Sequence, residues 1–218
     1  MKFETKNTRK RSTVASALAS LVCGAFVGSA IAQPTFFGPT PYLCSQDSPF
    51  IGLGLGYFYL ENFEDHLFNV PGVLANTGSV TSFNYGVGSA IIDSVDCDDG
   101  TINGTGLPGD SYFANPDLTF TFDAAVLGSL PTHVGLVWTD GGPNATVIFE
   151  AFDAGGASLG TITDVCGDNT YFGTTGEDRF FGVSSPGGIS SIRIRHNAGG
   201  LEIDHLQYGG EATRPADF

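Results

Sequence analysis

The side chains of this chain that could do chemistry are mostly carboxylates, and they occur in clusters. Glu61, Glu64 and Asp65 lie together at the end of an expected first strand, and Asp204 lies in the expected last strand. Calcium takes six to eight oxygen ligands from carboxylates and carbonyls. Because the first and last strands of a jelly roll can be neighbours, these four residues are the first candidate for a structural Ca²⁺ site.

A second acidic cluster lies in a glycine-rich loop. Its members are Asp93, Asp96, Asp98 and Asp99. The loop is not an EF-hand: with Gly100 at the sixth position, the first and third positions would be Val95 and Cys97. It is the second candidate for Ca²⁺. For both clusters the alternative is a set of solvated carboxylates at loop ends.

Signatures of catalysis are sparse. The histidines are scattered, and the sequence contains neither GxSxG nor HExxH. Paired carboxylates are abundant, which leaves a glycosidase open. His205 beside Asp204 could form an acid–base dyad, but adjacent residues of a strand usually point to opposite faces. Tyr171 and Phe172 could stack on sugar rings, whereas Trp138 ends an apolar strand and is expected in the core.

Three cysteines follow the N-terminal region: Cys44, Cys97 and Cys166. An odd number permits at most one intramolecular disulfide among them. Cys97 and Cys166 both lie in acidic loops, and we predict that these two pair. The alternatives are that Cys44 takes part or that all three are reduced. Zinc is not expected because there is no CxxC and no group of histidines.

Residues 1–32 have the pattern of a secretory signal peptide. Basic residues come first, an apolar run follows from about Val14 to Val27, and Ala30-Ile31-Ala32 is a small-x-small cleavage site. The apolar run is too short to span a bilayer, and no later stretch is long enough either. The expected product is secreted, on the cell surface or periplasmic after cleavage near Ala32.

The charge of the remaining chain is strongly negative. Of the 9 basic and 23 acidic residues, five basic and one acidic lie in residues 1–32, which leaves the rest with a net charge of −18 and no lysine. Such a chain would be repelled by nucleic acid and by anionic membrane surfaces. Solubility, or bound calcium, accounts for the acidity.

Short alternating segments punctuated by glycine and proline predict the fold. Ile192 and Ile194 face one side of a strand while Arg193 and Arg195 face the other. The last strand, residues 201–208, changes its apolar phase, which predicts a β-bulge at Asp204-His205. Further strands are expected at residues 57–63, 80–83, 118–122, 133–138, 145–152, 158–162 and 180–183. No amphipathic helix is evident.

This pattern predicts an all-β protein, an antiparallel β-sandwich of the jelly-roll type. We expect residues 33–56 to be an irregular lead-in rich in proline and glycine. The sandwich would occupy residues 57–209, and residues 210–218 would form a tail. About 185 residues suffice to bury the core of one domain.

Several segments resemble a group of exported bacterial β-sandwich domains that are often found in proteins with the sorting signal called PEP-CTERM. They are "SVDCDDGTINGTG", "LPTHVGLVWTDG", "FEAFDAGGASLG", "EDRFFGVSSPGGISSIRI" and "LEIDHLQYG". The resemblance covers Tyr57 to Gly209 and implies export and a jelly roll, but no activity. The final "GGEATRPADF" lacks a Pro-Glu-Pro motif, an apolar span and a basic tail. The shape also looks like that of carbohydrate-binding jelly rolls.

The expected function is that of a non-catalytic exported module. It would bind glycan or serve as a structural component of a surface or extracellular matrix, with a structural Ca²⁺. The alternative is a secreted enzyme that acts on polysaccharide, either a glycosidase or a lyase. An enzyme would need a cleft lined with carboxylates of shifted pKa and aromatic side chains.

Overall fold

The computed structural model describes residues 1–2, 32–82, 93–107, 109–115, 117–141, 144–167, 170, 173–197 and 199–211. The chain divides into two units, residues 1–30 and 31–218, and every described strand belongs to the second. Three features expected from the sequence lie outside the described residues: most of the signal peptide, most of the C-terminal tail, and the two aromatic residues Tyr171 and Phe172. No described helix is long and apolar enough to cross a membrane.

The second unit is built from antiparallel strands. They are β1 (Thr35–Pro41), β2 (Tyr57–Glu61), β3 (Val73–Ala75), β4 (Ser79–Ser82), β5 (Asp110–Ala114), β6 (Asp117–Phe122), β7 (His133–Asp140), β8 (Ala145–Phe152), β9 (Ser158–Cys166), β10 (Arg179–Ser184), β11 (Ser191–Arg195) and β12 (Leu201–Gly210). The described helices are single short turns: η1 (Ser45–Asp47), η2 (Asp96–Asp99) and α1 (Ala124–Leu127).

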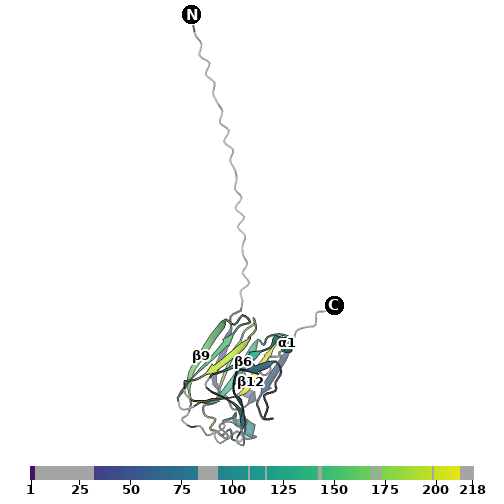
Figure 1. Cartoon of the computed structure of the whole chain (residues 1–218), viewed down its shortest axis with the longest axis vertical. Coiled ribbons are helices and arrows are strands. Elements are labelled where there is room, and N and C mark those ends of the chain that lie inside the picture. The colour runs from purple at the N-terminus through teal and green to yellow at the C-terminus, as the bar shows by residue number, and fades with distance from the viewer. Residues whose placement is uncertain are drawn as a thin grey trace, which may run out of the picture. The chain divides into compact units, whose positions relative to one another are not determined.

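The strands form two sheets that pack face to face (Figure 1). The larger sheet has the order β1-β10-β7-β12-β5-β4, with β2 also paired to β12, and the smaller has the order β3-β6-β11-β8-β9. Strands β5 to β12 alone give two four-stranded layers, β5-β12-β7-β10 and β6-β11-β8-β9. This is the eight-stranded arrangement of a jelly roll. The predicted all-β sandwich is confirmed.

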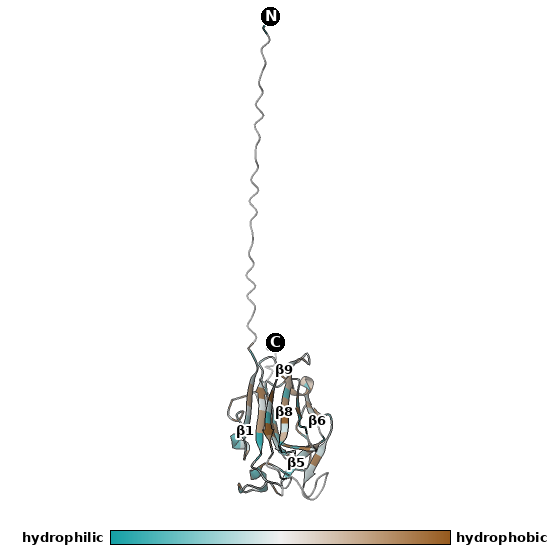
Figure 2. Cartoon of the chain, turned by 90° about the vertical axis from the view of Figure 1, so that its left-hand side faces the viewer, coloured by the Kyte–Doolittle hydropathy of each residue, from teal (hydrophilic) through white to brown (hydrophobic). Residues whose placement is uncertain are grey.

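The core lies between the two sheets and follows the period of two. Burial alternates along β8, which is labelled in Figure 2, at every residue. In β11, Ile192 and Ile194 are fully buried while the two arginines are half-buried, as predicted. Phe149 of β8 stacks on Phe181 of β10 with ring centroids 6.3 Å apart, which joins the layers.

The expected irregular lead-in contains a strand, so the predicted start of the domain at residue 57 is wrong. β1 pairs with β10 and forms one edge of the larger sheet. Its sequence conceals the strand because the register shifts between Phe37 and Thr40, around Gly38. Gly38 has φ 86°, and a Cβ there would collide with the Phe180 carbonyl oxygen. At the other end, β12 reaches Gly210, one residue past the predicted limit.

The outer face of the larger sheet, turned away from the smaller sheet, is also covered. Two segments lie on it, residues 42–50 and 93–99, which we call the covering segments. A second apolar cluster joins them to the sheet: Tyr42, Phe50 and Val95 pack with Val137 of β7 and Phe180 of β10. Polar side chains on this outer face are therefore sealed from solvent, which is unusual for a sandwich.

Candidate functional site

The β-bulge in β12 is where sequence and structure agree most closely. The register between β12 and β7 shifts between Asp204 and Gln207, and His205 has φ 43°, in the left-handed region. The predicted bulge at Asp204-His205 is confirmed. Ile203 and Leu206 belong to the core between the sheets, whereas Asp204, His205 and Gln207 are buried outside that core.

A hydrogen-bonded chain runs through the bulge into the covering segments. His205 Nε2 donates to Asp98 Oδ2 at 2.8 Å, because a carboxylate can only accept, and its Nδ1 accepts from the Tyr42 hydroxyl at 2.9 Å. Gln207 Nε2 donates to the same hydroxyl at 3.4 Å, and Gln207 Oε1 accepts from Ser48. Burial raises the pKa of Tyr42, so its hydroxyl remains a donor.

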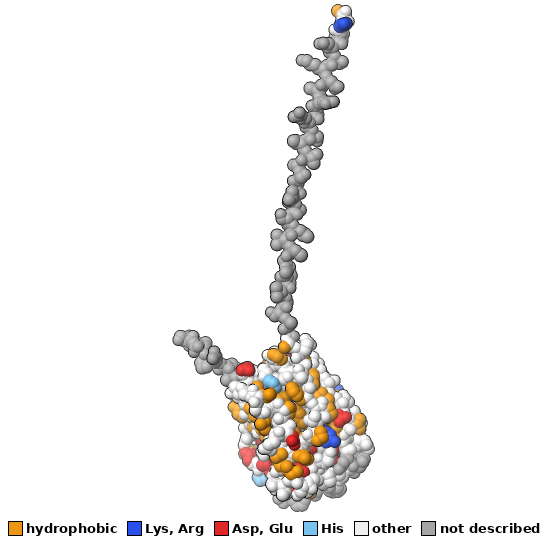
Figure 3. All heavy atoms as spheres, turned by 180° about the vertical axis from the view of Figure 1, so that it is seen from behind, with side chains coloured by type: hydrophobic (Ala, Val, Ile, Leu, Met, Phe, Trp, Pro, Cys, Tyr) orange, Lys and Arg blue, Asp and Glu red, His pale blue; other side chains and the backbone are white. Residues whose placement is uncertain are grey.

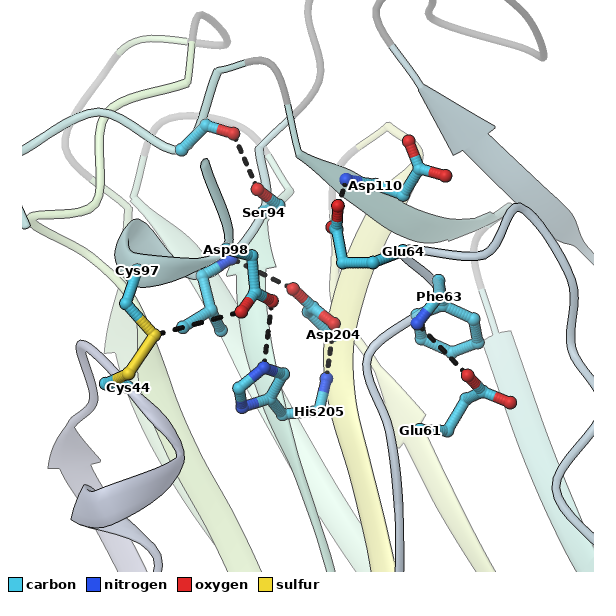
Figure 4. Close-up of polar contacts among 12 residues, drawn as sticks. Cys44, Glu61, Phe63, Glu64, Ser94, Cys97, Asp98, Asp110, Asp204 and His205 are labelled. Carbon is cyan, nitrogen blue, oxygen red and sulfur yellow. Dashed lines mark hydrogen bonds and ion pairs between the residues drawn. A yellow bond between two sulfur atoms is a disulfide. The ribbon is translucent and has the colours of Figure 1, made fainter. Parts of the chain in front are cut away.

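Asp98, Asp204 and His205 have potential ligand atoms within 4.8 Å of one another, the spacing of a metal site. Most of these atoms already have partners (Figure 4). Asp204 Oδ2 accepts from the Val95 backbone N–H at 2.9 Å and Oδ1 from that of His205 at 2.5 Å. Both ring nitrogens of His205 are also bonded. The trio works as a buried hydrogen-bond network that locks the cover to the sheet.

The electrostatics of the trio agree with this interpretation. Burial, and after it the charge of Asp98, raise the pKa of Asp204 well above its usual range, while its two backbone hydrogen bonds act in the opposite direction. Asp204 and His205 are at most 1% exposed. The pair therefore has no access to a substrate and cannot act as the acid–base dyad considered from the sequence.

The first predicted calcium set divides into separate groups. Glu61 Oε1 accepts from the Phe63 N–H at 3.1 Å, and Oε2 accepts from the N–H groups of Asn69 and Val70. Asp65 bonds Leu67 and Asn69 within an exposed turn. The strand expected to be first is β2, and its predicted pairing with the last strand is confirmed, since Glu61 of β2 lies opposite Leu206 of β12. Glu61 and Asp65 nevertheless organise the loop that follows β2.

Glu64 is the member of this set that lies near Asp98 and Asp204. Its Oε1 accepts from the Asp110 backbone N–H at 2.6 Å (Figure 4). Burial raises the pKa of Glu64 to about 7, although the Asp110 hydrogen bond opposes the shift. Its charge also raises the pKa of Asp204.

The second predicted set divides as well. Asp96 accepts from the N–H groups of Asn103 and Gly104, and Asp99 accepts from Thr101, so both shape their own loop. Asp98 turns to His205. Asp93 is different: it is fully buried, and neither carboxylate oxygen has a hydrogen-bond partner among the described residues.

The structure gives Asp93 neighbours that the sequence did not suggest. Burial raises its pKa, and the charges of four other carboxylates raise it further; they belong to Asp178, Glu177, Glu202 and Asp140. We call these five residues the acidic cluster. Alternation could have pointed to Glu202, which is two residues before Asp204 on the same strand. Asp178 and Glu177 immediately precede β10, but nothing in the sequence joins them to Asp93.

The predicted Cys97–Cys166 disulfide is wrong. Cys97 is bonded to Cys44, with the Cα atoms 5.3 Å apart, and Cys166 is a buried free thiol. The Cys97 N–H also donates to the Leu43 carbonyl at 3.1 Å. Both bonded cysteines belong to the cover, whereas Cys166 ends β9 at the edge of the smaller sheet. The acidic residues around both Cys97 and Cys166 in the sequence therefore did not indicate that the two cysteines are close in space.

Two surface hollows of the described residues contrast with the buried acidic groups. One is lined by Thr132, His133 and Glu211 with residues 184–186, and another includes Asp153 beside residues 32–34. Within the described lining, neither hollow contains two carboxylates. Trp138 is fully buried, as predicted. Lysine is absent beyond residue 10, and blue side chains are sparse on the domain face in Figure 3.

Comparison with known proteins adds no relationship. The chain matches no protein-family model, and no curated protein and no solved structure matches it.

Proposed function

We propose that this protein is a non-catalytic exported module that serves as a structural component of a cell surface or extracellular matrix. One observation carries the proposal: of the carboxylates with a raised pKa, all but the half-buried Glu64 are sealed inside the protein. Asp93, Asp178, Glu202 and Asp204 are at most 3% exposed. A catalytic carboxylate must reach its substrate, usually in a concave pocket.

The covering segments, residues 42–50 and 93–99, are also built in a way that suits a structural role. The Cys44–Cys97 disulfide ties the two segments together, and the hydrogen bonds of Asp204 tie the cover to β12. A disulfide is stable in an oxidising exterior, in keeping with the expected export. Buried polar networks whose members are all satisfied make a fold rigid.

Glycan binding is the second candidate, and it comes from the resemblance to carbohydrate-binding jelly rolls. Stacking on a sugar ring would need an aromatic face open to solvent. None of the large hydrophobic side chains that are exposed in the described residues is aromatic. The described surface therefore favours a structural component over a glycan-binding module.

Two measurements test the proposed function. Purified protein is incubated with a panel of common polysaccharides, and released reducing ends and retained glycan are both quantified. We expect neither release nor retention above that of a heat-denatured sample. Release of reducing ends would establish the enzyme instead, and saturable retention would establish the glycan-binding module. Fractionation of cells that express the full chain should place the protein outside the cytoplasm.

A further inference from the structure

We propose that the acidic cluster holds a divalent cation of the calcium type, with Asp93 and Asp178 as its central ligands. The site lies between the covering segment 93–99 and the end of the larger sheet. This proposal does not depend on the proposed function, because a cation can stabilise a binding module or an enzyme equally well.

Strand pairing brings the cluster together. Strands β10, β7 and β12 are consecutive in the larger sheet. Asp178 immediately precedes β10, Asp140 ends β7, and Glu202 of β12 lies opposite Asp140 in register. The Asp93 backbone N–H donates to Glu202 Oε2 at 2.8 Å, which fixes the covering segment over this end of the sheet.

Asp93 and Asp178 are the two members that require a ligand. Both side chains are 0% exposed, and none of their four carboxylate oxygens has a hydrogen-bond partner among the described residues. An unpaired buried charge costs several kcal/mol or more, so such groups are paired, protonated or bound to metal. The other three members surround them with further carboxyl groups.

Arg179 does not balance the charge of the cluster. It is the one basic group among the leading causes of the Asp178 pKa shift, and its effect is smaller than those of burial, Glu177 and Asp96. Its guanidinium donates to the backbone carbonyls of Gly176 and Asp178 rather than to a carboxylate of the cluster. Burial is the leading cause of the raised pKa of Asp93, and the next four causes are all carboxylates.

Protonation alone would leave the cluster unsatisfied. A protonated carboxyl group is an O–H donor and needs an acceptor, yet Asp93 and Asp178 have no described hydrogen-bond partner. A cation satisfies all four oxygens at once. The side chains would rotate to close on the ion, since they are not among the groups whose ligand atoms already lie within 4.8 Å.

The ligand atoms select the kind of cation. All five side chains of the cluster are carboxylates, without sulfur or imidazole, which favours a hard cation over zinc. Calcium accepts irregular sets of six to eight oxygens, including backbone carbonyls, whereas Mg²⁺ demands near-ideal octahedral geometry and retains water. A sealed site formed by separate segments therefore fits Ca²⁺ better than Mg²⁺.

Calcium titration of the chelator-treated protein is the first test. We expect CaCl₂ to raise the melting temperature by several degrees, MgCl₂ to have a smaller effect, and direct titration to give a saturable Kd. Asp178→Asn and Asp93→Asn should each weaken calcium binding at least tenfold. Asp65→Asn changes an exposed carboxylate with turn contacts only and should bind calcium like the original protein.

Asp204→Asn distinguishes the two possible locations. It should keep the calcium response, because Asp204 belongs to the hydrogen-bonded trio and not to the acidic cluster. Loss of calcium binding in Asp204→Asn alone would put the ion at the trio and overturn the proposal. Absence of any calcium effect on the original protein would overturn it as well.

Terbium luminescence gives a test that requires no change to a carboxylate. Trp138 is the single tryptophan and lies opposite Arg179 in the β7–β10 pair, beside Asp178. Excitation of its indole should therefore sensitise bound Tb³⁺, and CaCl₂ should displace the signal. Trp138→Phe should lose the signal while it still binds calcium. Terbium binding without sensitised emission would place the ion elsewhere and contradict the proposal. These outcomes do not depend on the polysaccharide assays.

Discussion

The Asp204 carboxylate accepts a hydrogen bond from the backbone N–H of Val95 at 2.9 Å, across 109 residues of sequence. Its other oxygen accepts from the N–H of His205. One side chain thus holds the covering segment 93–99 against the bulge of β12. The same segment begins with Asp93 of the acidic cluster, whose backbone N–H donates to Glu202.

Asp204→Ala should destabilise the protein by about 3 kcal/mol, because two buried N–H groups lose their acceptor at about 1–3 kcal/mol each. Asp204→Asn retains one acceptor oxygen and should cost about half as much. Urea denaturation measures both values. Equal stability of Asp204→Ala and the original protein would show that the Val95 contact does not hold the cover.

Removal of the disulfide should loosen the same cover. Cys44 and Cys97 are 53 residues apart, and a cross-link that closes a loop of this length stabilises by about 4 kcal/mol in the chain-entropy treatment. We expect the double variant Cys44→Ala/Cys97→Ala to lose stability on that order in urea. Peptide mapping of the oxidised protein should find Cys44 linked to Cys97. A Cys97–Cys166 peptide would contradict the structure.

Cys166 should be an unreactive thiol in the folded protein. Burial, with the Asp164 carboxylate close by, raises the pKa of Cys166 to about 12, so almost no thiolate exists at pH 8. Alkylation followed by mass spectrometry should label Cys166 slowly in native buffer and rapidly in urea. Fast native labelling would mean that the end of β9 opens readily.

Glu64 should make stability fall as the pH rises. Its pKa is about 7 in the folded protein, against an ordinary value of 4.5. A carboxyl group with a raised folded pKa contributes stability below pH 4.5 and loses that contribution as the pH rises to about 7. Glu64→Gln stays neutral and can still accept from the Asp110 N–H. Relative to the original protein, it should therefore gain stability between pH 5 and pH 8.

Thermal unfolding of both proteins at several pH values measures this difference. Asp65→Asn is the matched control, because it changes the neighbouring exposed carboxylate and should follow the original pH profile. A constant difference between Glu64→Gln and the original protein from pH 5 to pH 8 would refute the assigned shift.

Local patterns in the sequence predicted the sandwich and its bulge. The alternation around Ile192 and Ile194 describes a half-buried strand without reference to any other part of the chain. The change of apolar phase between Ile203 and Leu206 likewise requires a bulge wherever the strand lies in the fold. β1 escaped prediction because Gly38 and Pro39 interrupt its alternation.

Which residues the carboxylates and the cysteines contact is decided by the order of the strands in the sheets. Sequence established which residues carry carboxylates and that β12 carries Asp204 on a bulge. Only the tertiary structure brought Cys44 to Cys97 and surrounded Asp93 with Asp178 and Glu202. Burial within a strand follows from a period of two residues, which a sequence displays directly. Contacts between segments far apart in the sequence, such as the 53 residues between Cys44 and Cys97 or the 109 between Val95 and Asp204, follow from how the sheets pair and what covers them. No local period encodes such contacts.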